Sequence, residues 1–217
     1  MSAVYHRSLR GRLNEQRYLL VMDLVDLQPT DRVLDLGCGR GKKSVAYYNR
    51  TNPIVGVDRH PPASVRALGD NFEYVEGDAR YLPMFPDGSF DVVLSFGLLE
   101  HVVDDADVRA IIAEAARLAD RFAHVVPHPL AFIEPHTRMP LFGRWPAPVR
   151  SLYLRFGGRH RPSEYWRDLR WRSTKEWRAL FGDSDARVVR HWYGPLLMDY
   201  IIYGGRLDKG GRRETSA

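Results

Sequence analysis

The sequence predicts an α/β fold in which helices cover both faces of a mostly parallel β-sheet. Five short apolar segments alternate with segments of helical character before residue 127. Each is a nearly continuous hydrophobic run, which is typical of strands that helices bury on both faces. At 217 residues the chain is also long enough to bury a proper apolar core.

The expected elements follow one another in a regular order. Apolar positions spaced for one helix face predict a helix over 12–27, ahead of the break at Pro29-Thr30-Asp31. The first five strands are expected at 32–36, 54–58, 72–76, 90–95 and 121–126. Further helices are expected after the first strand through Tyr48, over 63–68, after the acidic cap formed by Asp104, Asp105 and Asp107, and over 174–181. Two final strands are expected at 187–192 and 197–203.

The regular pattern stops at Pro127. Residues 127–172 are rich in proline, arginine and aromatic residues and match no repeat of strand and helix. Between Arg138 and Arg172 there are nine arginines and two acids, a net charge of +7, whereas the whole chain carries +5. We therefore expect one domain over 1–217, with 127–172 as a cap insertion after the fifth strand and 208–217 as a disordered tail.

Composition excludes several classes of protein. The single cysteine, Cys38, rules out an internal disulfide and a cysteine-rich zinc site. No apolar run approaches the ~20 residues that a membrane span needs. The N-terminus lacks an apolar signal core, so these observations predict a cytoplasmic protein.

Glycines and acids stand at the ends of the first three expected strands. The first strand ends in Asp35-Leu36-Gly37-Cys38-Gly39-Arg40-Gly41, the second ends at Asp58, and the third is followed by Asp78. Ligands of open α/β sheets bind beyond the carboxyl ends of the strands. Glycines let the backbone approach a ligand closely, and an acid after the second strand suits ribose hydroxyls. A carboxylate after the third strand can accept a hydrogen bond from an adenine amino group, so the three strand ends predict a nucleoside site.

A dinucleotide is a poor match for this site. The Gly-x-Gly-x-x-Gly pattern fails because the third glycine comes one position early, and Asp35 precedes the first. A carboxylate there would repel a pyrophosphate, but it suits a ligand that carries an amino group and a sulfonium.

The run from Val33 to Gly41, together with Gly56-Val57-Asp58, Gly77-Asp78-Ala79 and Phe90-Asp91-Val92-Val93, resembles the class I S-adenosylmethionine-dependent methyltransferases of the small-molecule type. The resemblance covers residues 30 to 126. It implies a Rossmann-like seven-stranded sheet with an antiparallel last strand, and S-adenosylmethionine as the cofactor.

The resemblance also assigns cofactor-binding roles to residues at the strand ends. They are Asp35, Gly37 and Gly39 for the methionine part, Asp58 for the ribose, Arg59, Asp78 and Ala79 around the adenine, and Ser95 near the sulfur.

The methyl acceptor is expected over the ends of the fourth and fifth strands, where Glu100 and His101 follow the fourth strand. One interpretation has this pair cap the loop and support the cofactor. The other makes His101 a general base for a hydroxyl. In the cap, His136 is either a catalytic or substrate-binding residue, or a packed histidine. Some relatives hold a divalent metal with Glu-x-x-Glu-His, but Gly97 replaces the first glutamate, so no metal ligand is assigned. The cap still offers His128, Glu134 and His136 as replacements.

The absence of two motifs known from other methyltransferases narrows the class of methyl acceptor. The Asn/Asp-Pro-Pro-Tyr/Phe motif of adenine- and glutamine-directed enzymes is absent after the fourth strand, and the only cysteine lies in the cofactor loop rather than at a nucleophile position. We favour O-methylation of a small or oligomeric metabolite, such as a sugar or glycolipid precursor. One alternative is an RNA methyltransferase whose basic, aromatic cap binds phosphates and stacks bases. The other is a non-catalytic, cofactor-binding scaffold subunit.

Overall fold

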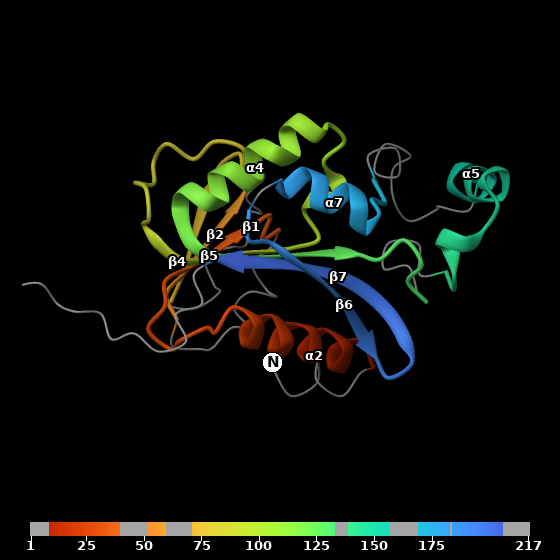
Figure 1. Ribbon diagram of the computed structural model, residues 1–217, viewed down its shortest axis with the longest axis horizontal. Coiled ribbons are helices and arrows are strands. Elements are labelled where there is room, and N and C mark those ends of the chain that lie inside the picture. The colour runs from red at the N-terminus through yellow and green to blue at the C-terminus, as the bar shows by residue number, and fades with distance from the viewer. Residues whose placement is uncertain are drawn as a thin grey trace, which may run out of the picture.

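A seven-stranded sheet organises the described part of the chain. The computed structural model describes residues 9–39, 52–59, 71–132, 139–156, 169–182 and 184–205. Within them the strand order is β3-β2-β1-β4-β5-β7-β6 (Figure 1). The strands are β1 (Val33–Leu36), β2 (Ile54–Asp58), β3 (Phe72–Glu76), β4 (Phe90–Phe96), β5 (Ala119–Pro127), β6 (Arg187–Tyr193) and β7 (Leu196–Gly205). Only β7 is reversed, since it pairs antiparallel with both β5 and β6. The predicted sheet with an antiparallel last strand is therefore confirmed.

Helices cover both faces of the sheet, as predicted. Helices α4 (Asp105–Leu118) and α7 (Thr174–Phe181) pack on one face, and α2 (Leu9–Leu24) packs on the other (Figure 1). The remaining described helical segments are η2 (Leu99–His101), η3 (Phe142–Arg144) and α5 (Ala147–Phe156). Each face buries its own apolar cluster, so the sheet is the partition between two cores.

Two helices begin at capping side chains, close to the positions that the sequence predicts. Helix α7 has the predicted bounds and begins with a capping box formed by Ser173 and Glu176. Helix α4 begins after Asp104, whose carboxylate accepts the Ala106 N–H at 2.8 Å. Both helices start where a side chain satisfies backbone N–H groups that have no partner inside the helix.

The first helix differs from its prediction. It ends at Leu24 rather than at residue 27, because Asp26 adopts a left-handed conformation with φ of 49° and the chain turns there. The predicted face, which includes Leu20, Leu24 and Leu27, is partly buried against the sheet. The most deeply buried side chains, Tyr18, Val21 and Val25, lie beside it.

Helix α5 is a further difference, because no helix was expected between residues 127 and 172. Other predictions lie outside the described residues: the helix after the first strand, the segment 63–68, Glu134, His136 and the tail 208–217. Among the described residues, no helix has both the length and the apolar character that crossing a membrane requires.

The strand order places a ligand crevice at one edge of the sheet. Strand β1 pairs with β2 on one side and with β4 on the other, so the direction of the crossovers reverses between β1 and β4. In open α/β sheets such a reversal opens a crevice beyond the carboxyl ends of the strands. The predicted cofactor residues follow these carboxyl ends.

A buried carboxylate fastens the loop between β3 and β4 to helix α4. Glu114 is 7% exposed and accepts the Leu82 N–H at 2.7 Å. Arg117 pairs with the same carboxylate at 2.6 Å and donates to the Phe85 carbonyl at 2.9 Å. The hydrogen bond from Arg117, aided by the Leu82 N–H, holds the pKa of Glu114 below its ordinary value of 4.5.

We expect Glu114→Gln to lower the free energy of unfolding at pH 7 by about 1–3 kcal/mol, since it removes charge-assisted hydrogen bonds. Because the folded-state pKa is depressed, the stabilisation is present above the unfolded value and is lost as the pH falls through the folded value. The difference between wild type and variant should therefore shrink below pH 4.5. Urea denaturation at several pH values measures it, with the exposed Glu73→Gln as the control. An equal difference at all pH values would contradict the assignment.

Candidate functional site

The glycine turn after β1 folds over the end of β2. Gly37 and Gly39 adopt positive φ angles of 71° and 59°, which glycine reaches without strain. The Gly37 N–H donates to the Val57 carbonyl at 2.8 Å, and the Gly39 N–H donates to Asp58 Oδ2 at 2.8 Å. The first two predicted cofactor segments are therefore joined directly.

A third glycine lets this turn lie close to the sheet. A Cβ atom on Gly56, in β2, would lie 2.5 Å from Phe72 Cζ and 2.8 Å from Cys38 Sγ. No side chain larger than hydrogen fits there without a shift in these neighbours. Gly56 thus sets how closely the turn approaches β2.

Carboxylates make the turn electronegative. Asp35 is 4% exposed, and Asp58 lies across the turn from it on the neighbouring strand. Burial raises the pKa of the Cys38 thiol, and the negative charges of Asp35 and Asp58 raise it further. Cys38 therefore stays protonated and is no nucleophile. The same potential opposes a pyrophosphate and favours a cationic group.

At the end of β3, the predicted adenine-side residues are held by ion pairs. Asp78 Oδ2 lies 3.0 Å from an Arg59 nitrogen and 2.6 Å from an Arg80 nitrogen. Arg80 also pairs with Asp107 of α4 at 2.9 Å. Hydrogen bonds from Arg80, with those from Arg59, hold the pKa of Asp78 well below its ordinary range. The neighbouring Ala79 is buried in the turn.

Ser95 lies within the sheet, with its side chain fully buried. Its hydroxyl forms a 2.8 Å hydrogen bond with Nδ1 of His124, its register partner on β5. Burial lowers the pKa of His124 to about 4, so the ring is neutral at pH 7. Sequence reasoning gave His124 no role. The pairing depends on the register of two strands that lie about thirty residues apart, and no local pattern reveals that register.

The turn after β4 carries the two predicted catalytic residues that the structure describes. Glu100 is 2% exposed, and His101 is half-buried at the end of η2. Gly97 has φ of 83°, and a Cβ there would lie 3.2 Å from Glu100 Oε1. A glutamate at position 97, as in the metal-binding relatives, would be strained in this backbone. Among the described residues, no group of three His, Cys, Asp or Glu side chains is placed to hold a metal ion.

The last residues of the cap, Arg170 and Arg172, bind the turn after β4. The Arg170 N–H donates to the Glu100 carbonyl at 2.7 Å. Arg172, 7% exposed, donates to the Val102 carbonyl at 3.1 Å and pairs with Asp105 at 2.8 Å. Residues that follow the turn by some seventy positions therefore hold it in place, and only the folded chain reveals the contact.

Sequence reasoning also missed a polar cluster between α2 and the end of the sheet. Arg17 of α2 lies 3.5 Å from Asp199 of β7, and Asp199 accepts from His191 Nδ1 at 3.1 Å. Burial alone would lower the pKa of the Arg17 guanidinium, but the negative charge of Asp199, and that of Glu100, raises it overall. Arg17 therefore stays charged, with Asp199 as its ion-pair partner.

Of the three residues considered as replacement metal ligands, the structure describes only His128. His128 Nδ1 accepts the Leu130 N–H at 2.9 Å, which leaves the ring proton on Nε2. Its ring packs against Tyr200 at 4.2 Å between centroids. Burial lowers the pKa of His128 to about 4. His136, the third predicted catalytic residue, lies outside the described residues.

Aromatic side chains of the cap pack on one another. Phe142 is fully buried, with Trp145, Tyr153 and Trp171 around it at ring-centroid distances of 5.4, 5.7 and 6.0 Å. These rings form a small core that supports η3 and α5. Their packing leaves them poorly placed to stack on nucleic-acid bases.

Comparison with known proteins finds similarity to methyltransferases. A family model described as a methyltransferase domain matches residues 34–125. The chain is 36% identical over 107 residues to a ubiquinone biosynthesis O-methyltransferase of Hahella chejuensis, covering 45% of each chain. It is 30% identical over 132 residues to a probable chloroplastic tocopherol O-methyltransferase of rice, covering 56% of this chain and 35% of the relative. The matches thus span less than half of either relative.

Solved structures share the fold. The crystal structure of geranyl diphosphate C-methyltransferase from Streptomyces coelicolor, in complex with Mg²⁺, geranyl diphosphate and S-adenosylhomocysteine, superposes with a TM-score of 0.59 at 15% identity. The superposition covers 91% of this chain and 79% of that one. Residues 34–125 thus match a methyltransferase domain, and the chain shares the fold of a solved methyltransferase structure, which agrees with the sheet order and the glycine turn described above.

Proposed function

We propose that the protein transfers a methyl group from S-adenosylmethionine to a hydroxyl of a small or oligomeric metabolite. The observation that carries the proposal is the electronegative glycine turn at the strand-order reversal, where Asp58 accepts the Gly39 N–H and the charges of Asp35 and Asp58 both act on Cys38. Its charge complements the ammonium and sulfonium of this cofactor and opposes a pyrophosphate.

The residues present fit the cofactor. Gly37 and Gly39 expose backbone at the turn, with Asp35 beside them for the amino group. Asp58 reaches the turn from β2 and offers acceptor oxygens to ribose hydroxyls. Asp78 stays ionised and suits an amino group of the adenine. When bound, S-adenosylmethionine supplies an electrophilic methyl group on its sulfonium.

We assign the acceptor side to the turn after β4. His101 is half-buried at the carboxyl edge of the sheet, where a neutral imidazole can take the proton of an acceptor hydroxyl. Glu100 is more deeply buried and near the charge of Arg17, which favours a role in positioning the turn. His136 remains a proposed catalytic or substrate-binding residue of the cap.

Two relatives support the choice of a hydroxyl, since both are named as O-methyltransferases. A sugar or glycolipid precursor remains our proposed acceptor class, because the arginines of the cap suit hydroxyl and phosphate oxygens. RNA is less favoured, because Trp145, Tyr153 and Trp171 pack around Phe142.

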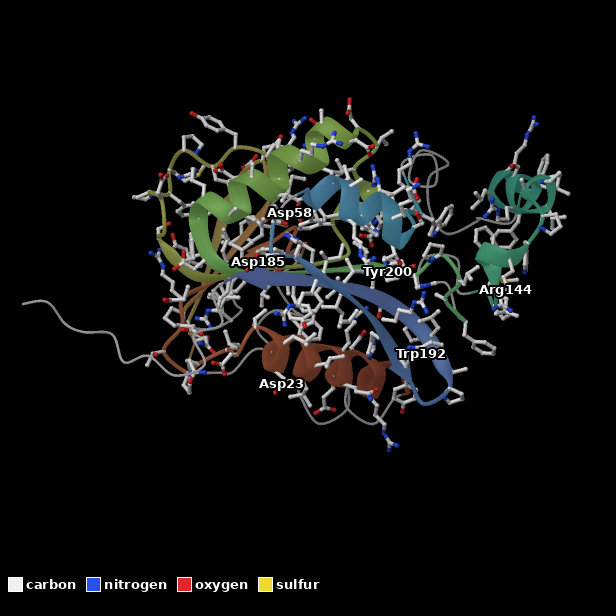
Figure 2. The ribbon with its side chains drawn as sticks, viewed as in Figure 1. Asp23, Asp58, Arg144, Asp185, Trp192 and Tyr200 are labelled. Atoms are coloured by element: carbon white, nitrogen blue, oxygen red, sulfur yellow. The ribbon has the colours of Figure 1, made fainter. Side chains whose placement is uncertain are left out.

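Asp58→Ala should weaken binding of S-adenosylhomocysteine by about 1–3 kcal/mol, roughly five- to 150-fold in Kd, since the ribose loses a charged acceptor. Isothermal titration calorimetry measures the effect. Asp23→Ala is the matched control, because this exposed aspartate lies on α2, away from the strand ends (Figure 2). An unchanged Kd for Asp58→Ala would show that the ribose is held elsewhere.

The variant His101→Ala distinguishes the hypothesis of an enzyme from that of a non-catalytic scaffold subunit. With a hydroxylated acceptor found by screening, we expect turnover to fall roughly 10²- to 10⁴-fold, the usual contribution of a general base. Affinity for S-adenosylhomocysteine should stay near the wild-type value, which serves as the internal control for folding. Unchanged turnover would refute the assignment of His101 as the base.

A further inference from the structure

Helix α5 presents an apolar row to solvent. The row consists of Val149, Leu152 and Phe156, which are 46%, 61% and 65% exposed. Their spacing of three and four residues places them on one face of the helix. The flank next to the row is anchored, because Tyr153 packs edge-on against Trp145 and Phe142 and Arg150 lies over the ring of Trp171. The helix is therefore held in an orientation that exposes its apolar face.

Arginines flank the apolar row. Residues 142–156 contain Arg144, Arg150 and Arg155 and no acid. Arg155 lies over the ring of Phe156, 5.3 Å from its centroid. Arg144 and Arg155 are both exposed to solvent. The surface around the row is thus positively charged and open to an anionic partner.

The row stands at the acceptor end of the molecule. Helix α5 lies beyond the carboxyl end of β5, the same edge at which the turn with His101 follows β4 (Figure 1). The hairpin between β6 and β7 reaches this end too, where Trp192 is 47% exposed (Figure 2). Leu130 and Phe132, just after β5, are 41% and 38% exposed.

We propose that α5 docks the protein onto an anionic lipid surface, with the apolar row seated among the acyl chains and the arginines at the headgroups. A surface helix that carries apolar and basic residues side by side binds an anionic membrane through hydrophobic insertion and through charge attraction. At about 15 Å for ten residues, it is far too short to span a bilayer and suits the interface.

A protein partner fits the row less well. Three side chains on one short helix bury far less than the about 1,000 Å² that a stable protein interface needs. A lipid surface needs no such area, because charge attraction adds to the insertion of each apolar side chain.

Co-sedimentation of the full chain with vesicles tests the proposal. We expect binding to vesicles of phosphatidylcholine mixed in equal parts with phosphatidylglycerol, and little binding to phosphatidylcholine alone. Added salt should weaken the binding, since it screens the arginines. Arg155→Glu should weaken it as well, without changing the melting temperature.

Two matched variants isolate the apolar row. Leu152 and Leu19 are both helical leucines, 61% and 59% exposed. Leu152→Asp should lower the affinity for anionic vesicles roughly tenfold or more, while Leu19→Asp leaves it unchanged. Thermal melting of both variants controls for folding.

Failure of wild-type binding, or equal binding by the two variants, would overturn the proposal. Light scattering gives a further test. If the wild type dimerises and binds no vesicles, and Leu152→Asp abolishes the dimer, the proposal is overturned and a second copy of the chain is the partner of the row. Titration of the same variants with S-adenosylhomocysteine keeps this result separate from the proposed methyl transfer, because α5 makes no extensive contact with β1, β2, β3 or β4, the strands whose ends carry the cofactor residues.

Discussion

The hydrogen bond from the Gly39 N–H to the Asp58 carboxylate is the contact on which the candidate site depends. It joins the turn after β1 to the end of β2, and it exists only because Gly39 takes a left-handed conformation and Gly56 has no Cβ to hold the turn away. The same contact brings two carboxylates, Asp35 and Asp58, around one turn. Mutual repulsion of these charges opposes the arrangement, and a cationic ligand relieves it.

The candidate acceptor side, which is the turn after β4, also depends on contacts from parts of the chain that are distant in sequence. Arg172 and the Arg170 N–H fix the turn that carries Glu100 and His101, while Arg17 approaches from the other face of the sheet. A buried carboxylate such as Glu100 is costly without nearby positive charge. The end of the cap is therefore part of the site, since it positions the turn that carries Glu100.

The described part of the cap has a packed side and an exposed side. Trp145, Tyr153 and Trp171 pack around Phe142 and build a small core. Arg144, Arg155 and the apolar row of α5 face solvent, whereas Arg172 is buried against the turn after β4. The arginines of the described cap therefore serve two purposes, since some are exposed and one holds the turn in place.

The sequence by itself determined the strands, their order along the chain, and the glycines and acids at their ends. These features are local: buried strands appear as apolar runs, and parallel strands bring their carboxyl ends to one edge. Only the tertiary structure decided that Ser95 pairs with His124, that Arg17 reaches Asp199, and that α5 forms with its apolar face exposed. Strand register and long-range packing set these contacts, and neither leaves a periodic trace in the chain.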